Sequence, residues 1–286
     1  MSSLALALVL ASAVAHATWN LLTKRVEAGA SFIWLFDLVS VLVYAPMVAM
    51  AIELRGMPVR AAAFGLILIS SLLHLGYFVL LTRGYRAGDL SLVYPLARGT
   101  GPLLATIAAI VVLGERPGPL GLAGALLVVG GAVVLSGDPT RLRQTGAGRA
   151  VGYALLTGGF IAAYTLVDKE GVSAVLVPPV AYTWGISLGS CLLLTPHAGR
   201  HRQEVLRLWR SHRRATIAVG VLSPLAYILV LSALVFSPIS SIAPTREIGV
   251  LFGTVMGSRL LGEGDAGRRL AAAGAMVLGV ALLALR

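Results

Sequence analysis

The sequence has few charged residues, and acidic residues are the scarcest of them. Of its 286 residues, 23 are lysine or arginine and 12 are aspartate or glutamate, so that charged residues make up 12% of the chain. A soluble domain usually carries about 25% charged residues. Hydrophobic residues reach 57%, and the mean hydropathy is +0.88. A chain with so little polar surface does not fit the ordinary soluble classes, and we predict an integral membrane protein.

Cysteine is nearly absent, and the motifs of several enzyme classes are missing. The single cysteine, Cys191, excludes an intrachain disulfide and cannot form a structural zinc site. The histidines follow no metal-ligand spacing, and the glycine-rich stretches lie inside apolar runs rather than after strands, so no phosphate-binding loop is expected. No Ser-His-Asp arrangement stands out either. We therefore predict that the protein is not an enzyme and carries no metal and no cofactor.

The basic residues that are present lie mostly in short connections between apolar runs. A net charge of +11 would suggest nucleic-acid binding in a soluble chain, but no aromatic-basic module accompanies it, so we expect no nucleic-acid partner. Arginine beside apolar runs is typical of topology signals and of contacts with anionic lipid headgroups. We therefore expect a multi-pass protein of the plasma membrane that has the lipid bilayer as a partner. The densest group lies in the connection 196–214 and comprises Arg200, Arg202, Arg207, Arg210, Arg213 and Arg214.

Apolar runs of about 20 residues fill most of the chain and predict membrane-spanning helices. The connection between the fifth and sixth runs contains Asp138, Pro139 and several arginines, and it divides the spans into two groups of five. We assign residues 1–137 to a first five-helix repeat, 138–148 to a linker and 149–286 to a second five-helix repeat. The ten predicted spans are 4–22, 32–52, 62–82, 90–113, 119–136, 149–168, 175–195, 215–235, 239–260 and 268–285.

Short motifs recur at a distance of about half the chain. The sequence WNLLTK at 19–24 returns as YTLVDK at 164–169, and Leu-Gly-Glu at 113–115 returns at 261–263. Because each half contains an odd number of spans, a second copy of the same fold must enter the membrane from the opposite side. Substrate sites of such inverted repeats lie near the bilayer midplane, between the repeats. We predict an all-α integral membrane protein of ten transmembrane helices arranged as two inverted five-helix repeats.

These motifs resemble those of the EamA-type transporters in the drug/metabolite transporter superfamily. The resemblance rests on Trp-Asn-x-x-x-Lys closing the first span and on a proline followed by Leu-Gly-Glu around the fourth, and it covers nearly the whole chain. It implies a secondary transporter, an exporter of small metabolites, amino acids or drugs, working by alternating access around a central cavity. Two alternatives stay open: a non-transporting scaffold or lipid-binding protein, and a membrane enzyme that acts on lipid-linked substrates.

The charge distribution and the resemblance disagree about orientation. Connections 1–2, 3–4, 5–6, 7–8 and 9–10 hold fifteen lysines and arginines, whereas the other side holds five. The positive-inside rule therefore places both termini outside the cytoplasm. The resemblance implies that both termini lie inside. We favour the charge rule, and the sequence leaves the solute, the coupling ion and the direction of transport open.

Charged residues inside predicted spans mark the candidate site, because a charge near the bilayer midplane costs about 2.5–3.5 kcal/mol. Arg98 and Arg246 lie seven or eight residues into spans four and nine. We expect them to line a shared cavity and to bind a solute that bears a carboxylate; the alternative is snorkelling or pairing with a backbone carbonyl. Glu247 and Asp37 are coupling candidates. Glu247 is expected to pair with Arg98 or to carry a proton, and Asp37 is expected to be neutralised by Lys24 or Arg98.

Uncharged polar and aromatic residues complete the candidate site. His16 and His74 lie in spans one and three, where they serve either as coupling groups or as hydrogen-bonding groups between helices. Aromatic residues near span ends belong either to interface belts or to the walls of the cavity. The further substrate-binding candidates are Trp19, Asn20, Tyr77, Tyr94, Tyr164 and Tyr227.

Two further motifs are assigned structural roles. Glu115 and Glu263 are expected to cap the turn into the next span, because carboxylates are favourable at helix N-termini. Ala271, Ala275 and Gly279 recur every four residues along span ten. Such a stripe of small residues predicts close helix packing and offers a candidate homodimer contact.

Overall fold

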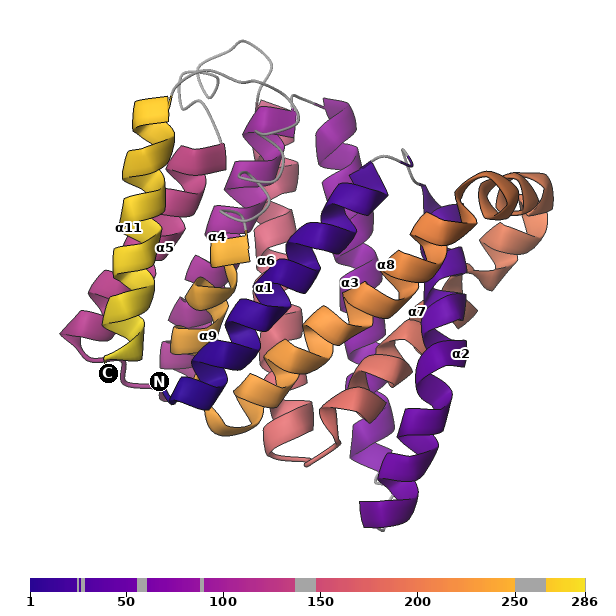
Figure 1. Ribbon diagram of the computed structural model, residues 1–286, viewed down its shortest axis with the longest axis horizontal. Helices are drawn as coiled ribbons and strands as arrows, with labels where there is room; N and C mark the ends of the chain where they lie inside the picture. The colour runs from indigo at the N-terminus through magenta and orange to yellow at the C-terminus, as the bar shows by residue number, and fades with distance from the viewer. Residues whose placement is uncertain are drawn as a thin grey trace.

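Helices account for nearly all of the structure in Figure 1. The computed structural model describes residues 1–24, 26, 29–55, 61–87, 90–136, 148–249 and 266–285. Within these ranges the chain forms helices and no strand. The helices are α1 (Ser3–Lys24), α2 (Ala30–Arg55), α3 (Ala61–Ala87), α4 (Leu90–Val112), α5 (Pro119–Ser136), α6 (Gly148–Ser173), α7 (Pro179–Arg200), α8 (Arg202–Phe236), α9 (Ile239–Arg246) and α11 (Ala266–Ala284).

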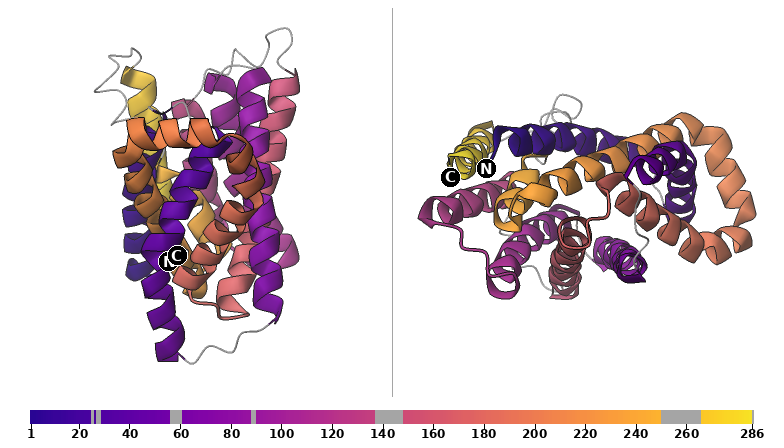
Figure 2. Two further views of the ribbon diagram at one scale, coloured as in Figure 1. Left: turned by 90° about the vertical axis from the view of Figure 1, so that its right-hand side faces the viewer. Right: turned by 90° about the horizontal axis from the view of Figure 1, so that it is seen from below.

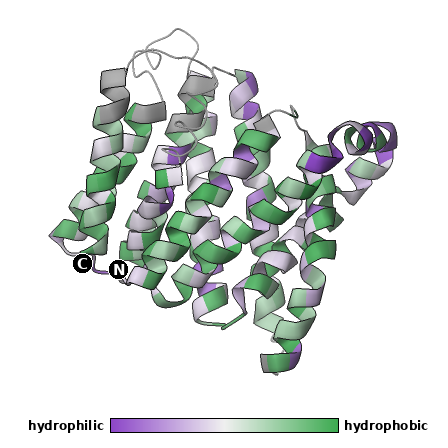
Figure 3. Cartoon of the chain, viewed as in Figure 1, coloured by the Kyte–Doolittle hydropathy of each residue, from purple (hydrophilic) through white to green (hydrophobic). Residues whose placement is uncertain are grey.

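The helices follow the apolar runs of the sequence, because in lipid a helix satisfies its backbone hydrogen bonds internally. Helices α1, α2, α3, α6 and α8 are long and apolar enough to cross a membrane, and shorter apolar helices occupy Leu96–Val112, Pro119–Val134 and Ala271–Ala284. Hydrophobic residues dominate along these helices in Figure 3. The predicted all-α membrane protein with two repeats is confirmed. The part of span nine beyond residue 249 lies outside the described residues.

The two repeats run in opposite directions and pack against each other. Helix α1 begins at the end of the bundle where both termini lie, whereas α6 begins at the opposite end (Figure 1). Between the repeats, α1 packs on α8 and α3 on α6, while α2 packs on α7 and α5 on α11. In the second repeat, α6, α7, α8 and α11 are the counterparts of α1, α2, α3 and α5. When each helix is replaced by its counterpart, the same set of packed pairs results. This exchange is the pattern that a pseudo-two-fold axis in the membrane plane produces.

Glycine allows α5 and α11 to approach closely. A Cβ atom added at Gly279 would lie 2.7 Å from the carbonyl oxygen of Gly124 and 2.7 Å from Cγ2 of Val128, so neither helix has room for a side chain there. Gly279 belongs to the small-residue stripe predicted along span ten, and it therefore packs within the chain. Ala271 of the same stripe is exposed. A homodimer contact through this helix stays a prediction.

The first Leu-Gly-Glu motif joins the two repeats. Gly114 adopts a φ of +67°, a left-handed conformation that favours glycine, and the chain turns there at the end of α4. The carboxylate of Glu115 accepts hydrogen bonds from the backbone N–H groups of Ile239 at 2.7 Å and Ser240 at 2.9 Å. Glu115 therefore caps the N-terminus of α9 in the other repeat, not the next span as the sequence suggested. Glu263 lies outside the described residues.

The Arg-rich segment between the seventh and eighth spans is helical, whereas the sequence predicted a connection over 196–214. Helix α7 continues to Arg200, and α8 begins at Arg202. Non-helical backbone angles at His201 and His212 separate residues 202–211 from the helices on either side. Figure 2 (left) shows this segment running crosswise at the end of the bundle. The charged residues make this segment too polar to span the membrane. It is still helical, because leucine, arginine, glutamate and glutamine are good helix formers.

Candidate functional site

A cavity of about 170 Å³ lies between the two repeats. Its wall is formed by α1, α2, α3 and α4 of the first repeat and by α6, α7, α8 and α9 of the second. The structure therefore brings together side chains that are far apart in the sequence. Of the candidate site residues, the cavity is lined by His16, Trp19, Asp37, His74, Tyr77, Arg98, Tyr164, Tyr227 and Arg246.

Arg98 forms an ion pair across the repeat interface. Its Nε atom lies 3.3 Å from Oε2 of Glu247, and the two side chains are only 9% and 2% exposed. Arg98 comes from α4, and Glu247 directly follows α9, the counterpart of α4 in the second repeat. The pairing expected from the scarcity of intramembrane acids is therefore present. An ion pair in so dry a setting makes each partner depend strongly on the other.

Arg246 occupies the equivalent place in the second repeat but has a different environment. Its guanidinium carbon lies 5.9 Å from the ring centroid of Tyr227, within the range of a cation–π contact. Among the described residues Arg246 forms no salt bridge, although the charge of the adjacent Glu247 acts on it. Its side chain is half-buried and lines the cavity. This guanidinium group is thus a positive charge at the cavity wall without a salt bridge from the described residues.

An aromatic cluster forms the wall beside Arg246. The ring of His74 stacks on that of Tyr164 with their centroids 4.0 Å apart, and Tyr227 approaches His74 edge-on at 5.4 Å. The Nδ1 atom of His74 lies 2.9 Å from the carbonyl oxygen of Ser70. The hydroxyl of Ser70 lies 3.2 Å from the same Nδ1 atom, so Ser70 holds this side of the ring and Nε2 is left as its second polar atom.

His16 and Trp19 face the same cavity from α1. Their rings meet edge to face with centroids 4.9 Å apart, one helical turn from each other. Asn20 does not line the cavity; its side-chain amide donates a hydrogen bond to the carbonyl oxygen of His16 at 2.8 Å. The side chain of Tyr94 lies outside the described part of the structure.

Asp168 is a buried acid that the sequence reasoning placed at the end of span six and did not propose as part of the site. It is fully buried, and the hydroxyl of Tyr227 donates a hydrogen bond to its Oδ2 atom. Its Oδ1 atom has no hydrogen-bond partner among the described residues. Helix α6 continues for another turn to Ser173, so Asp168 lies inside the bundle. Asp168 follows the candidate residue Tyr164 by four positions and therefore lies on the same face of the helix. This spacing could have identified Asp168 as a site residue from the sequence.

Lys169, the residue after Asp168, forms its hydrogen bonds at the end of α8 and not with that carboxylate. Its Nζ atom donates hydrogen bonds to the carbonyl oxygens of Leu234 and Ser237, the latter at 3.0 Å. Lysine thus binds backbone oxygens at the end of α8, where the helix leaves its last carbonyls without partners. Lys169 is a structural residue at a helix end, and the side chain of its counterpart Lys24 lies outside the described residues.

The cavity combines guanidinium groups, aromatic rings and one carboxylate, Asp37. Such a lining can bind an organic solute through charge and ring stacking, and both repeats contribute to it. In the part of the chain that the structure describes, no group of three or more His, Cys, Asp or Glu side chains could hold a metal ion.

Comparisons with known proteins agree with this architecture. No curated protein matches the chain. Solved structures do match it, and one described as "Crystal structure of protein" has a TM-score of 0.74 and 17% sequence identity over 100% of this chain and 98% of that chain. At this identity the likeness shows the fold alone. The model of the EamA-like transporter family matches residues 3–137 and again residues 148–285. Because these two matches cover nearly the entire chain, the protein belongs to the EamA-like transporter family and is a membrane transporter of the drug/metabolite type.

Proposed function

We propose that the protein is a secondary transporter that exports small organic solutes bearing an anionic group, by alternating access around the cavity between its repeats. Arg246 carries this proposal, because it lines the cavity and forms no salt bridge among the described residues. A carboxylate on the solute would supply the missing partner. A guanidinium group can hold a carboxylate through two parallel hydrogen bonds.

The construction of the cavity supports alternating access. Its wall is divided between two repeats of opposite direction, so rocking of one repeat against the other would expose the same side chains first to one side and then to the other. Export is proposed because the EamA-type transporters that the sequence resembles are often exporters.

The aromatic cluster supports an organic solute with a flat or apolar part. Tyr77, Tyr164 and Tyr227 line the same cavity as Arg246, and their rings contact one another. A solute bound to Arg246 through its anionic group would place its remaining atoms against these rings, where burial of apolar surface adds to the binding free energy.

The test compares cells that produce the wild-type protein, Arg246→Ala, Arg246→Lys or no transporter. Carboxylate metabolites are quantified in the medium and in the cells, and each value is corrected for the amount of protein in the membrane. We expect the wild type to lower the intracellular level of a specific set of carboxylates and to raise it in the medium. Both Arg246 variants should lose this effect, since an ammonium group cannot reproduce the guanidinium fork.

A matched control is Arg83→Ala, which removes an exposed arginine near the end of α3. This variant should export as the wild type does. Undiminished export by Arg246→Ala, per inserted molecule, would show that the solute does not bind there. Equal metabolite profiles with and without the wild-type protein would refute transport of carboxylates altogether.

A further inference from the structure

A second charged region of the cavity centres on Asp37 of α2. Its side chain lines the cavity and is only 7% exposed. Ser187 of α7 lines the same cavity. Arg98, one of the partners expected for Asp37, is paired with Glu247, and no described basic side chain forms a salt bridge with Asp37. The carboxylate therefore faces the cavity without a positive partner from the described residues.

Hydroxyl groups from α7 surround the same region. Thr183, Ser187 and Ser190 are spaced by four and three residues, so they share one face of the helix, and all three line the cavity. Each is buried, at 4%, 7% and 7% exposure respectively. The Oγ1 atom of Thr183 has no hydrogen-bond partner among the described residues, and a buried hydroxyl without a partner is unfavourable. A cation coordinated by this hydroxyl oxygen would supply the partner that Thr183 lacks.

We propose that Asp37, Thr183, Ser187 and Ser190, called here the oxygen subsite, bind a small cationic group: a sodium ion or the ammonium group of the solute. The set offers one negative charge and hydroxyl oxygens only, and oxygen donors are the ligands that hard cations prefer. The charged form of a carboxyl group is costly in a dry cavity, and a bound cation would stabilise it there. The inference rests on the proposed function only in placing this ligand in the transport cavity.

The experiment measures thermal unfolding of the purified full-length protein in detergent. Sodium chloride is compared with potassium chloride and N-methyl-D-glucamine chloride at equal ionic strength, and 2-phenylethylamine is compared with 2-phenylethanol. Stabilisation by sodium alone identifies the free ion, whereas stabilisation by the amine but not the alcohol identifies an ammonium group. If neither probe stabilises the wild type, the oxygen subsite binds no cation and the proposal is overturned.

Variants then locate the effect. Asp37→Asn keeps the size of the side chain but removes its charge, and it should weaken binding of the active probe by about tenfold or more. Thr183→Val replaces one hydroxyl by a methyl group of the same shape and should weaken it to a smaller extent. Glu53→Gln, an exposed acid on the same helix, is the control and should bind as the wild type does. Equal probe binding by Asp37→Asn and the wild type overturns the assignment. Because Arg246 is intact throughout, these results do not depend on carboxylate export.

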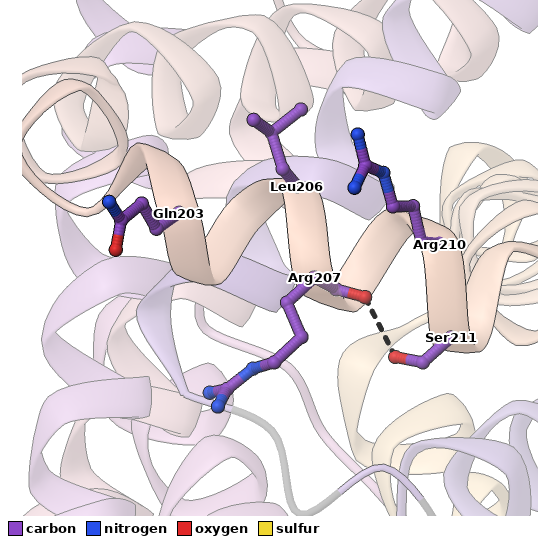
Figure 4. A pocket seen from close by; sticks show the side chains of 5 residues that line it. All are labelled: Gln203, Leu206, Arg207, Arg210 and Ser211. Atoms are coloured by element: carbon purple, nitrogen blue, oxygen red, sulfur yellow. Dashed lines mark hydrogen bonds between the residues drawn. The ribbon is translucent and has the colours of Figure 1, made fainter.

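A different surface carries an independent inference. The crosswise segment 202–211 turns one face to the bundle, where Leu208 packs against the cluster that contains Phe32 and Val219. The rest of its surface exposes Leu206 at 52% and Trp209 at 38%, next to exposed arginines. Figure 4 shows Leu206 and Arg210 extending to one side of the helix and Arg207 to the other. Apolar and cationic side chains are thus mixed on the exposed surface of the segment, at the periphery of the bundle (Figure 2).

We infer that the exposed surface of this segment binds anionic phospholipid headgroups. Tryptophan is enriched at membrane–water interfaces, and arginine beside it can reach the phosphates. Basic residues near an anionic membrane surface are attracted to it electrostatically. The headgroup layer is therefore an environment that accommodates Leu206, Trp209 and the neighbouring arginines at once. The segment lies across the ends of the spanning helices, which places it at the depth of that layer.

The test compares the thermal stability of the purified full-length protein in mixed micelles of detergent with phosphatidylglycerol or phosphatidylcholine. Phosphatidylglycerol should raise the unfolding temperature of the wild type more than phosphatidylcholine does. The double variant Arg207→Gln, Arg210→Gln should lose this difference. The control double variant Arg83→Gln, Arg86→Gln removes two exposed arginines elsewhere and should retain it. An equal loss in both double variants, or the same stabilisation by inorganic phosphate, would overturn the inference.

Discussion

Breaking the Arg98–Glu247 pair should destabilise the protein more than removing both partners. The two groups lie 3.3 Å apart and are almost completely buried. Arg98→Met leaves the carboxylate of Glu247 without its partner in a dry environment, which costs about 3–5 kcal/mol. Glu247→Gln has the converse effect, since the guanidinium group of Arg98 then lacks its counter-charge. With both substitutions no unpaired charge remains at the pair, and most of the lost stability should return.

The measurement is a double-mutant cycle on the unfolding temperature of the purified protein. For a chain of this size about 1 kcal/mol corresponds to about 2–4 °C, so each single variant should unfold about 6–20 °C below the wild type. The double variant should unfold within about 6 °C of it. Additive effects, with the double variant the least stable of all, would show that the two groups do not depend on each other. That result would refute the reasoning from burial.

Three further predictions concern the packing and the orientation of the chain. Glu115→Ala removes the carboxylate that caps α9 with two hydrogen bonds and should lower the free energy of unfolding by about 2 kcal/mol. The measurement is the unfolding temperature, and an unchanged value would mean that the cap adds nothing to stability. Gly279→Ala should lower the unfolding temperature, because its Cβ would lie 2.7 Å from backbone and side-chain atoms of α5, while Gly274→Ala, which meets nothing within 4 Å, should not. A cysteine at Ser211, in a chain whose Cys191 is replaced by alanine, should be shielded from a membrane-impermeant thiol reagent in intact cells if the Arg-rich side faces the cytoplasm. Ready labelling from outside would contradict that orientation.

Much of the fold could be predicted because hydropathy and helix length are local properties. Most of the apolar runs correspond to helices to within about five residues; the exceptions are α8, which begins 13 residues before the predicted eighth span, and the ninth span, most of which lies outside the described residues. The odd number of spans in each half implied the inversion. The pair formed by Arg98 and Glu247 was also within reach, since few acids lie inside the spans and a buried arginine needs one of them.

Other features depend on contacts that no local pattern records. The partner of Glu115 is the start of α9, which lies in the other repeat, so a helix-capping motif alone could not identify it. Asp168 was not predicted as a site residue because the apolar run ends there. Helix α6 continues one turn further, and packing in the bundle buries Asp168. The segment 202–211 was taken for a connection because hydropathy detects membrane spans and not amphipathic helices.

The pairing of Arg98 and the cap made by Glu115 also set an order of events during synthesis. Both groups belong to the first repeat, and both find their partners at α9, close to the end of the chain. At about 5–20 residues per second, the ribosome needs many seconds to reach α9 after α4 has been made. During that interval a buried arginine and a free carboxylate must be tolerated by lipid, water or the insertion machinery. The first repeat therefore completes its folding only when the second arrives, and a chain interrupted before α9 should be recognised by quality control as unfinished.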